Sequence, residues 1–227
     1  MIIEEMDDLA RNLATVRERI ARAADRAKRD PAGVLLLAVT KVFPADAIRA
    51  AYDLGLREFG ENYVQEFEGK APLVADLAGS RFHLIGHLQS NKSARAAELF
   101  QTIQTVDSAK LARRLDSAGH PMDVMIEVKL GDEEAKSGAD PSSLPELARA
   151  IRACPNLHLR GLMTMPPWSE DPEAPRPIFR RLRELAAEHN LTGLSMGMSN
   201  DLETAIEEGS TCVRVGTALF GKRKKPA

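Results

Sequence analysis

Apolar residues near the start of the chain recur at alternating steps of four and three positions. They are Ile2, Met6, Leu9, Leu13, Val16 and Ile20. This spacing places them along one face of a helix, while charged residues occupy the other face. The pattern predicts a long helix over residues 3–29.

Downstream of this helix, short apolar segments alternate with helical patterns, and turn-forming residues separate them. Eight of the short segments have the length and composition of strands. They are Leu35–Lys41, Glu58–Asn62, Arg81–His87, Thr102–Asp107, Asp123–Leu130, Leu157–Thr164, Leu191–Ser199 and Cys212–Thr217. Eight strand-then-helix units in 227 residues predict an α/β fold closed into a (β/α)8 TIM barrel. Alternation alone does not reveal closure, so a doubly wound open sheet is the main alternative.

The sequence shows no linker or low-complexity segment that would divide it. We therefore expect one domain over residues 1–227, with a basic, disordered tail at 222–227. One segment is irregular: residues 165–177, MPPWSEDPEAPRP, whose prolines disfavour regular structure. It holds the single tryptophan, Trp168. This segment is either a stiff rim or lid beside a site or a long connection, and the two interpretations are equally open.

Composition narrows the class of protein. A hydrophobic content of 44% is ample for a core, and the two cysteines, Cys154 and Cys212, are too far apart in sequence to indicate a zinc site or a disulfide framework. The first residues are acidic and amphipathic, unlike a secretory signal, and no apolar run reaches membrane-spanning length, so we expect a cytoplasmic protein. A formal charge of -2 argues against a general nucleic-acid or membrane binder.

Lys41 ends the apolar run LLLAVTKVF, residues 35–43. A short apolar run bounded by turn signals is typical of a parallel strand buried on both faces. Lys41 is therefore predicted at the carboxyl end of the first strand, the edge at which α/β barrels bind ligands. Burial there would lower the pKa of its amine, whose neutral form attacks carbonyls to give a Schiff base. On position alone, a solvated loop lysine is the better interpretation.

Two later turns have the character of anion sites. In LSMGMSNDLETAI, residues 194–206, a strand ends at Ser199 and a helix follows, so Ser199 is predicted to cap that helix while free N–H groups face an anion. In VRVGTALFG, residues 213–221, Gly216 permits close backbone approach, Thr217 offers a hydroxyl, and Arg214 lies on the last strand. The loops after strands seven and eight of TIM barrels commonly bind phosphate.

The acidic residues Asp201 and Glu203 would repel a phosphate if they pointed inward, and we expect both to face solvent. A lysine at one side of the barrel's carboxyl-terminal opening and an anion site at the other side would together bind a ligand that carries both an aldehyde and a phosphate. Pyridoxal 5'-phosphate is such a ligand. A lysine aldolase acting on sugar phosphates would use the same two elements.

Six segments resemble, in order and spacing, motifs of the pyridoxal phosphate homeostasis protein family, single-domain relatives of the alanine racemase barrel. They are AVTK (38–41), FGENYVQE (59–66), HLIGHLQSNK (83–92), GLMTM (161–165), SMGMSNDLETAI (195–206) and RVGTALFG (214–221). The similarity runs from the first helix to Gly221. It implies a (β/α)8 barrel and a Schiff base between the cofactor and Lys41. It also implies phosphate contacts from Ser199, Arg214, Gly216 and Thr217, with Asn62 beside the ring.

The resemblance further implies a role in intracellular vitamin B6 homeostasis and amino-acid balance, as a carrier or buffer without an established reaction. The expected partners are pyridoxal 5'-phosphate and apoenzymes that use it, and the expected state is a monomer or weak dimer without metal. The alternative is an amino-acid racemase of the alanine racemase type, in which Tyr63 or His87 would have to act opposite Lys41. Racemases on this barrel resemble one another in adding a carboxyl-terminal β domain, and its absence here favours the carrier. For the pyridine nitrogen, Arg214 is our expected contact.

Strand five departs from the family pattern. Glu127 and Lys129 stand where the family usually has polar amides, and if both face the interior we expect them to pair with each other. Lys129 is a second, weaker candidate for the reactive amine. His83 is expected to have a hydrogen-bonded structural role, with His87 nearer the mouth. Four methionines are expected in the core, those nearest the mouth touching the ring: Met163, Met165, Met196 and Met198.

Overall fold

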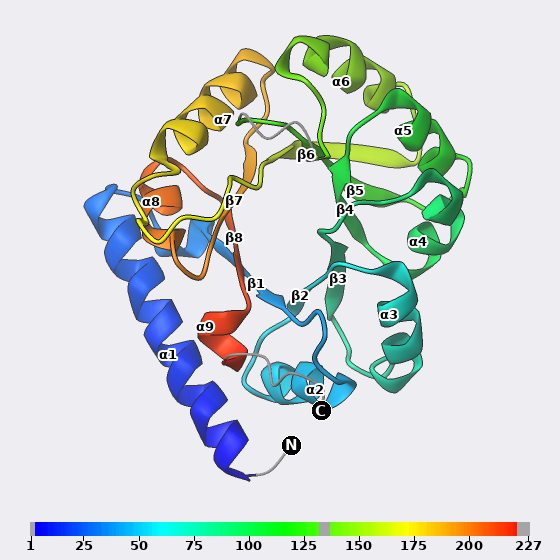
Figure 1. The fold of residues 1–227 in the computed structure, drawn as a ribbon. Coiled ribbons are helices and arrows are strands. Elements are labelled where there is room, and N and C mark those ends of the chain that lie inside the picture. The colour runs from blue at the N-terminus through cyan, green and yellow to red at the C-terminus, as the bar shows by residue number, and fades with distance from the viewer. Residues whose placement is uncertain (1–2, 132–136, 222–227) are drawn as a thin grey trace.

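A closed barrel of eight parallel strands forms the centre of the molecule, as seen down its axis in Figure 1. The structure, a computed structural model, describes residues 3–131 and 137–221. Every strand pairs with its neighbours in sequence, and β8 closes the barrel against β1. The strands are β1 Leu35–Val39, β2 Glu58–Glu61, β3 Arg81–Leu84, β4 Thr102–Val106, β5 Met122–Glu127, β6 Leu157–Met163, β7 Gly193–Met198 and β8 Cys212–Val215. The predicted (β/α)8 barrel is confirmed, and the open-sheet alternative is wrong.

Strand β1 shows why the strand segments of this sequence are continuously apolar. Leu37 and Val39 point into the barrel and pack with Ile85 and Cys212. Ala38, between them, packs outward in the layer between the strands and the surrounding helices. Both faces of the strand are therefore buried. A polar residue at every second position would lie either in the barrel interior or in the layer between the strands and the helices, so both sets of positions are apolar.

Helices surround the barrel on its outside (Figure 1). They are α1 Ile3–Arg26, α2 Ala45–Asp53, α3 Val64–Lys70, α4 Ser93–Leu99, α5 Ala109–Asp116, α6 Leu144–Arg152, α7 Arg176–Glu188, α8 Leu202–Glu207 and α9 Thr217–Phe220. Short 3-10 turns lie in the connections between helices and strands of the described residues, at η1 Pro31–Gly33, η2 Ala71–Leu73, η3 Ser90–Lys92 and η4 Pro141–Ser143.

The long helix α1 lies along α8 and α9 and is followed by the first strand (Figure 1). Four of its predicted apolar residues are buried against the barrel helices: Leu9, Leu13, Val16 and Ile20. The helix ends at Arg26, three residues before the predicted end, because Lys28 adopts a left-handed backbone with φ of 53°. Residues 1–2 and the tail at 222–227 lie outside the described residues.

The predicted strands extend too far at their carboxyl ends. Lys41, Asn62, Ser199 and Thr217 each lie one to two residues beyond the last paired residue. The ladder of hydrogen bonds stops where the chain must turn outward to the next helix. The candidate residues are therefore held on the turns at the mouth of the barrel rather than on its strands.

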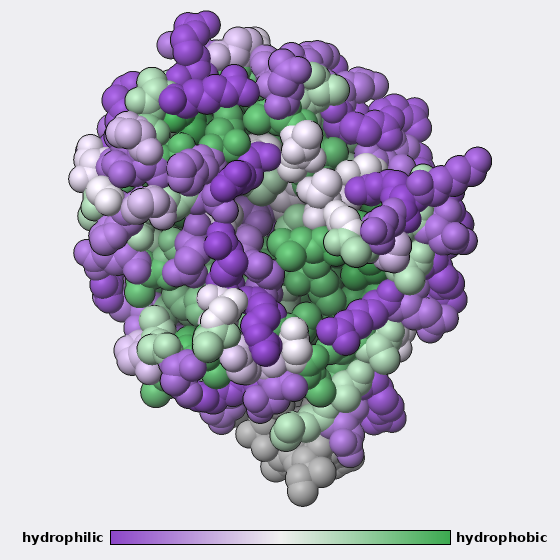
Figure 2. Space-filling view, turned by 180° about the vertical axis from the view of Figure 1, so that it is seen from behind, coloured by the Kyte–Doolittle hydropathy of each residue, from purple (hydrophilic) through white to green (hydrophobic). Residues whose placement is uncertain are grey.

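The opposite end of the barrel carries a hollow of about 400 Å³, lined by the start of β1 and by Glu58 at the start of β2. The rear view in Figure 2 shows mostly hydrophilic residues at the periphery, with hydrophobic residues gathered near the hollowed middle. Within residues 3–131 and 137–221, no helix is long and apolar enough to cross a membrane.

Candidate functional site

A cavity of about 670 Å³ opens at the carboxyl ends of the strands. It is lined by every residue that the sequence singled out for cofactor binding: Lys41, Asn62, Ser199, Arg214, Gly216 and Thr217. Apolar side chains complete its wall, namely Val39, Phe43, Ile85, Met165, Trp168 and Met198. The topology thus brings the first strand's lysine and the last two turns, far apart in sequence, to one cavity.

Lys41 occupies a tight turn directly after β1. It is half-buried, and the next residue, Val42, has a left-handed φ of 62°, which is uncommon for a β-branched residue. The Val42 N–H donates to Oε1 of Glu66. This contact fixes the turn that aims the Lys41 side chain at the cavity.

A buried ion cluster lies beneath this turn. Nζ of Lys70 donates to the Thr40 carbonyl oxygen at 3.0 Å and to Oε1 of Glu61 at 2.9 Å, and it lies 2.6 Å from Oε1 of Glu66. Thr40 Oγ1 also donates to Glu61 at 2.7 Å. Burial raises the pKa of Glu61, and the charge and hydrogen bond of Lys70 oppose that rise. Sequence reasoning missed Lys70, although its spacing of four from Glu66 was visible.

Asn62 follows β2 and presents an unsatisfied acceptor. Its Oδ1 is buried and has no hydrogen-bond partner among residues 3–131 and 137–221. Buried amide oxygens without a partner are rare in folded proteins and mark a place where an absent group is expected. Asn62 lines the cavity, so the geometry fits a polar ligand there.

Ser199 joins the two predicted anion turns to each other. Its Oγ accepts a hydrogen bond of 3.2 Å from the backbone N–H of Ala218, in the first turn of α9. The prediction that Ser199 caps the helix after it is wrong, because α8 begins at Leu202 and its preceding residue is Asp201. Gly216 packs against β1, since a Cβ there would lie 3.3 Å from the Val39 carbonyl oxygen.

The prediction that Asp201 faces solvent is also wrong. Asp201 is 7% exposed and lines the cavity, and its Oδ1 accepts a hydrogen bond of 2.6 Å from the Met198 N–H. Burial raises the pKa of this carboxyl, and the backbone hydrogen bond and the charge of Arg214 act against the rise. Glu203 points away from the cavity but is not fully solvated, because it is bound to Arg19 of α1.

Arg214 is buried, lines the cavity and starts a chain of polar groups through the barrel. Its guanidinium donates to Ser195 Oγ at 2.9 Å and to the Thr164 carbonyl oxygen at 2.9 Å. Burial lowers its pKa, and the nearby acidic groups, Cys212 first, raise it. The chain continues from Ser195 to Gln104 at 2.6 Å and from Gln104 to His83 at 3.0 Å.

His83 ends this chain at a carboxylate: its Nε2 lies 2.6 Å from Oε2 of Glu58. The predicted structural role of His83 is confirmed. His87 instead is exposed, with Nδ1 3.9 Å from Asp107. Tyr63 is 58% exposed. Among the described residues, neither Tyr63 nor His87 lines the cavity.

The predicted pair of Glu127 and Lys129 does not form. Glu127 is buried at the end of β5, where it accepts a hydrogen bond of 3.1 Å from Ser137 Oγ. Burial raises the pKa of Glu127. Lys129 lies past the strand end, and its charge acts on Asp140. The reason is that β5 stops at Glu127, so the two residues do not continue on one strand face.

The methionines divide as expected: Met163 and Met196 are fully buried, and Met165 and Met198 line the cavity. Trp168 is 74% exposed and also lines the cavity. The irregular segment that holds it therefore forms part of the rim, which favours the rim over the plain connection.

The sequence resembles known proteins along nearly its whole length. The alanine racemase N-terminal domain family matches residues 9–224. The pyridoxal phosphate homeostasis protein of Pseudomonas aeruginosa is 50% identical over 224 residues, covering 96% of this chain and 97% of that protein. The protein of that name from Escherichia coli K12 is 44% identical over 229 residues, covering 96% and 98%. The chain belongs to the pyridoxal phosphate homeostasis protein family.

Solved structures of similar proteins superpose on this barrel. PipY of Synechococcus elongatus, with pyridoxal phosphate bound, is 39% identical, with a TM-score of 0.83 and coverage of 94% of this chain and 100% of that one. Its structure without the cofactor has a TM-score of 0.84. Alanine racemase from Corynebacterium glutamicum is 21% identical with a TM-score of 0.68, and the chain spans 60% of it, which shows a shared fold.

Proposed function

We propose that this protein binds pyridoxal 5'-phosphate as a Schiff base on Lys41 and acts in intracellular homeostasis of the cofactor, as a carrier or buffer that also influences amino-acid balance. The observation that carries the proposal is that one cavity is lined both by Lys41 and by the turns after β7 and β8, which have the character of anion sites. A family that includes a pyridoxal-phosphate-bound member supports it.

The residues of the cavity fit the two ends of the ligand. Lys41 supplies the amine: its nitrogen forms a bond to the aldehyde carbon, the carbonyl oxygen leaves as water, and addition of water reverses the step. Ser199, Gly216 and Thr217 would hold the phosphate with hydroxyl and backbone N–H groups, and Arg214 would supply positive charge in the same cavity. The unpartnered Asn62 oxygen gains a neighbour when the cavity is filled. The cofactor itself supplies the aldehyde and the electron-withdrawing ring.

The positions of Tyr63 and His87 favour a carrier over a racemase. Racemisation requires proton transfer on both faces of the ligand, hence a second acid or base opposite Lys41. The two side chains considered for that role are exposed, and among the described residues neither lines the cavity. We place the protein in the cytoplasm, as a monomer or weak dimer that donates the cofactor to apoenzymes.

Titration of the apoprotein with pyridoxal 5'-phosphate tests this function. We expect a visible absorption band that borohydride removes, and recovery of activity when the loaded protein is mixed with an apoenzyme that needs the cofactor. The alternative is tested by incubating the loaded protein with L-alanine in heavy water. Rapid α-deuteration with racemisation would show that the protein is a racemase rather than a carrier. Absence of the visible band in the titration would favour an aldolase acting on sugar phosphates.

A further inference from the structure

Helix α1 contacts both turns at the phosphate end of the cavity. It lies outside the barrel, beside α8 and α9 (Figure 1). Two of its polar residues reach inward from positions seven apart, and hence from one face of the helix: Asn12 and Arg19. Each of them donates a hydrogen bond to a backbone carbonyl oxygen in or next to one of the two turns.

Arg19 binds the turn after β7. Its Nη2 donates to the Ser199 carbonyl oxygen at 3.0 Å. The same guanidinium makes a bidentate pair with Glu203, from Nε to Oε1 at 2.6 Å and from Nη2 to Oε2 at 2.7 Å. The Arg19 side chain is 21% exposed, so the pair is largely shielded from water. A planar guanidinium held at two points has little freedom, and its third contact fixes the carbonyl of Ser199.

Asn12 binds the turn after β8. Its Nδ2 donates to the Leu219 carbonyl oxygen of α9 at 2.9 Å. Between the two contacts of α1, the turns are joined to each other by the hydrogen bond from the Ala218 N–H to Ser199 Oγ. Ser199 is thus fixed through its carbonyl by Arg19 and through its hydroxyl by α9.

We propose that α1 sets the geometry of the phosphate site and that Arg19 is a positioning residue for the phosphate of the ligand. Arg19 does not line the cavity and acts through Ser199. It sets where the Ser199 hydroxyl and the neighbouring N–H groups stand relative to α9. This inference rests on the proposed function, because it assigns the phosphate to those two turns.

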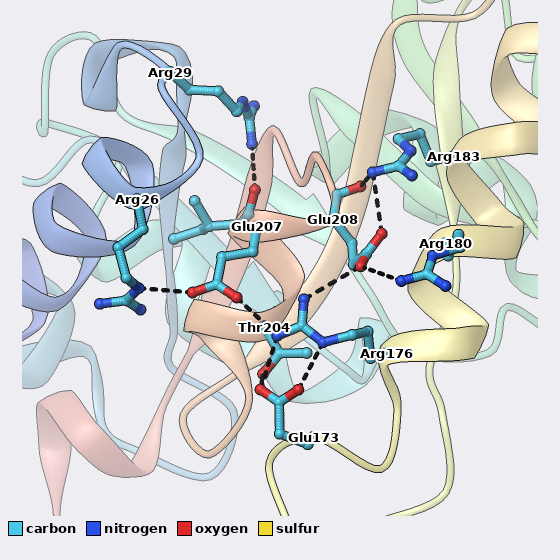
Figure 3. A network of polar contacts seen from close by, with 10 residues as sticks. Arg26, Arg29, Glu173, Arg176, Arg180, Arg183, Thr204, Glu207 and Glu208 are labelled. Carbon is cyan, nitrogen blue, oxygen red and sulfur yellow. Dashed lines mark hydrogen bonds and ion pairs between the residues drawn. The ribbon is translucent and has the colours of Figure 1, made fainter.

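The chain offers a matched control in Arg26. Arg26 lies seven residues after Arg19 and makes an ion pair of 2.8 Å with Glu207, also between α1 and α8 (Figure 3). That pair lies at the far end of α8 from Ser199. Arg19→Met and Arg26→Met both remove a pair that joins the same two helices, but only the first frees the Ser199 carbonyl.

The experiment compares the dissociation constants of pyridoxal 5'-phosphate and pyridoxal, which lacks the phosphate, for the wild type and both variants. We expect Arg19→Met to weaken binding of pyridoxal 5'-phosphate about tenfold and to leave pyridoxal within about twofold, since loss of a charged hydrogen bond loosens only the phosphate end. Arg26→Met should leave both constants within about twofold. Thermal unfolding of both variants measures the structural contribution of each pair separately.

Equal losses of pyridoxal 5'-phosphate affinity in the two variants, or an equal loss for pyridoxal in Arg19→Met, would overturn the role of Arg19. If Arg19→Met does not fold, Arg19→Lys and Arg26→Lys are compared by the same ratio, because lysine keeps the charge but not the three-point contact. Failure of the proposed function is distinct: the wild type itself would then bind pyridoxal as well as its phosphate or give no visible band.

Discussion

Nζ of Lys70 lies 3.0 Å from the carbonyl oxygen of Thr40, the residue immediately before Lys41. The same ammonium contacts Glu66, which accepts the Val42 N–H immediately after Lys41. A buried lysine therefore holds the backbone on both sides of the residue that we propose as the cofactor's attachment point. Lys41 is thus positioned by a second lysine, Lys70, which is not among the residues that line the cavity.

Lys70→Met is expected to lower the free energy of unfolding by about 3–5 kcal/mol, because it leaves the buried Glu61 carboxylate without its cation. The double variant Lys70→Met with Glu61→Gln removes both charges and should be less destabilised than the single variant. Urea denaturation of the wild type, the two single variants and the double variant measures this. A double variant that is as unstable as the sum of its parts would show that the two charges do not interact.

Ser199→Ala is expected to weaken binding of pyridoxal 5'-phosphate by about tenfold or more, because it removes the hydroxyl that we propose to hold the phosphate, and a hydrogen bond to a charged group contributes about 1.5–3 kcal/mol. Absorbance titration measures the dissociation constant. Ser117→Ala is the control, because the exposed Ser117 hydroxyl donates to the Arg113 carbonyl oxygen within its own helix end, away from the cavity. Unchanged affinity for pyridoxal 5'-phosphate in Ser199→Ala would show that the Ser199 hydroxyl takes no part in binding the ligand.

Gly161→Ala is expected to abolish folding or to cost more than about 3 kcal/mol, the upper part of the usual range for an overpacked core. The added Cβ would lie 2.0 Å from the Gly193 carbonyl oxygen on the paired strand β7. Gly33→Ala is the matched control, because a Cβ there meets nothing within 4 Å, and its stability should change by less than about 0.5 kcal/mol. Soluble yield and thermal unfolding measure the folding and the stability of both variants. A stable Gly161→Ala protein would contradict the tight pairing of β6 with β7.

Stability should fall in acid through the arginine network shown in Figure 3. Glu208 is buried, yet hydrogen bonds from Arg180 and Arg176 outweigh the effect of burial and hold its pKa below the ordinary 4.5; the pKa of Glu207 is lowered in the same way by Arg176 and Arg26. A lowered folded-state pKa stabilises the fold above the unfolded-state value, and that stabilisation is lost as the pH falls through the folded-state pKa.

Glu208→Gln should therefore differ from the wild type most above about pH 5 and least in stronger acid, as urea unfolding across pH 3–7 would measure. Glu18→Gln removes an exposed pair with Arg22 and should differ little at any of these pH values. A wild-type advantage over Glu208→Gln that grows in acid would contradict the assigned direction of the shift.

The sequence predicted the barrel and the placement of Lys41 because both depend on local signals. Each strand is a short apolar run with turn residues at its ends, and eight such runs leave few alternatives. The ends of the strands were less predictable, since a residue such as Asn62 looks the same on a strand and just past it. Whether the segment around Trp168 forms part of the rim was undecided for a related reason. Its prolines indicate irregular structure, but they do not indicate which part of the protein the segment contacts.

The errors concern contacts between residues far apart in sequence. Asp201 was expected in solvent because its charge is unfavourable beside a phosphate. It is buried instead, and the Met198 N–H and the charge of Arg214 offset only part of the effect of that burial on its pKa. The contact of Arg19 with Ser199 spans 180 residues, and Lys70 is buried only because β2 and the Lys41 turn enclose it. No local pattern carries such information.

The central claim is that the amine of Lys41 forms the bond to the cofactor. The most direct test is to load the protein with pyridoxal 5'-phosphate, reduce it with borohydride and map the modified peptide by mass spectrometry. The account predicts one pyridoxyl group, on Lys41, and none in a Lys41→Ala variant treated in the same way. A label on Lys129 or Lys70, or a Lys41→Ala protein labelled as fully as the wild type, would contradict it.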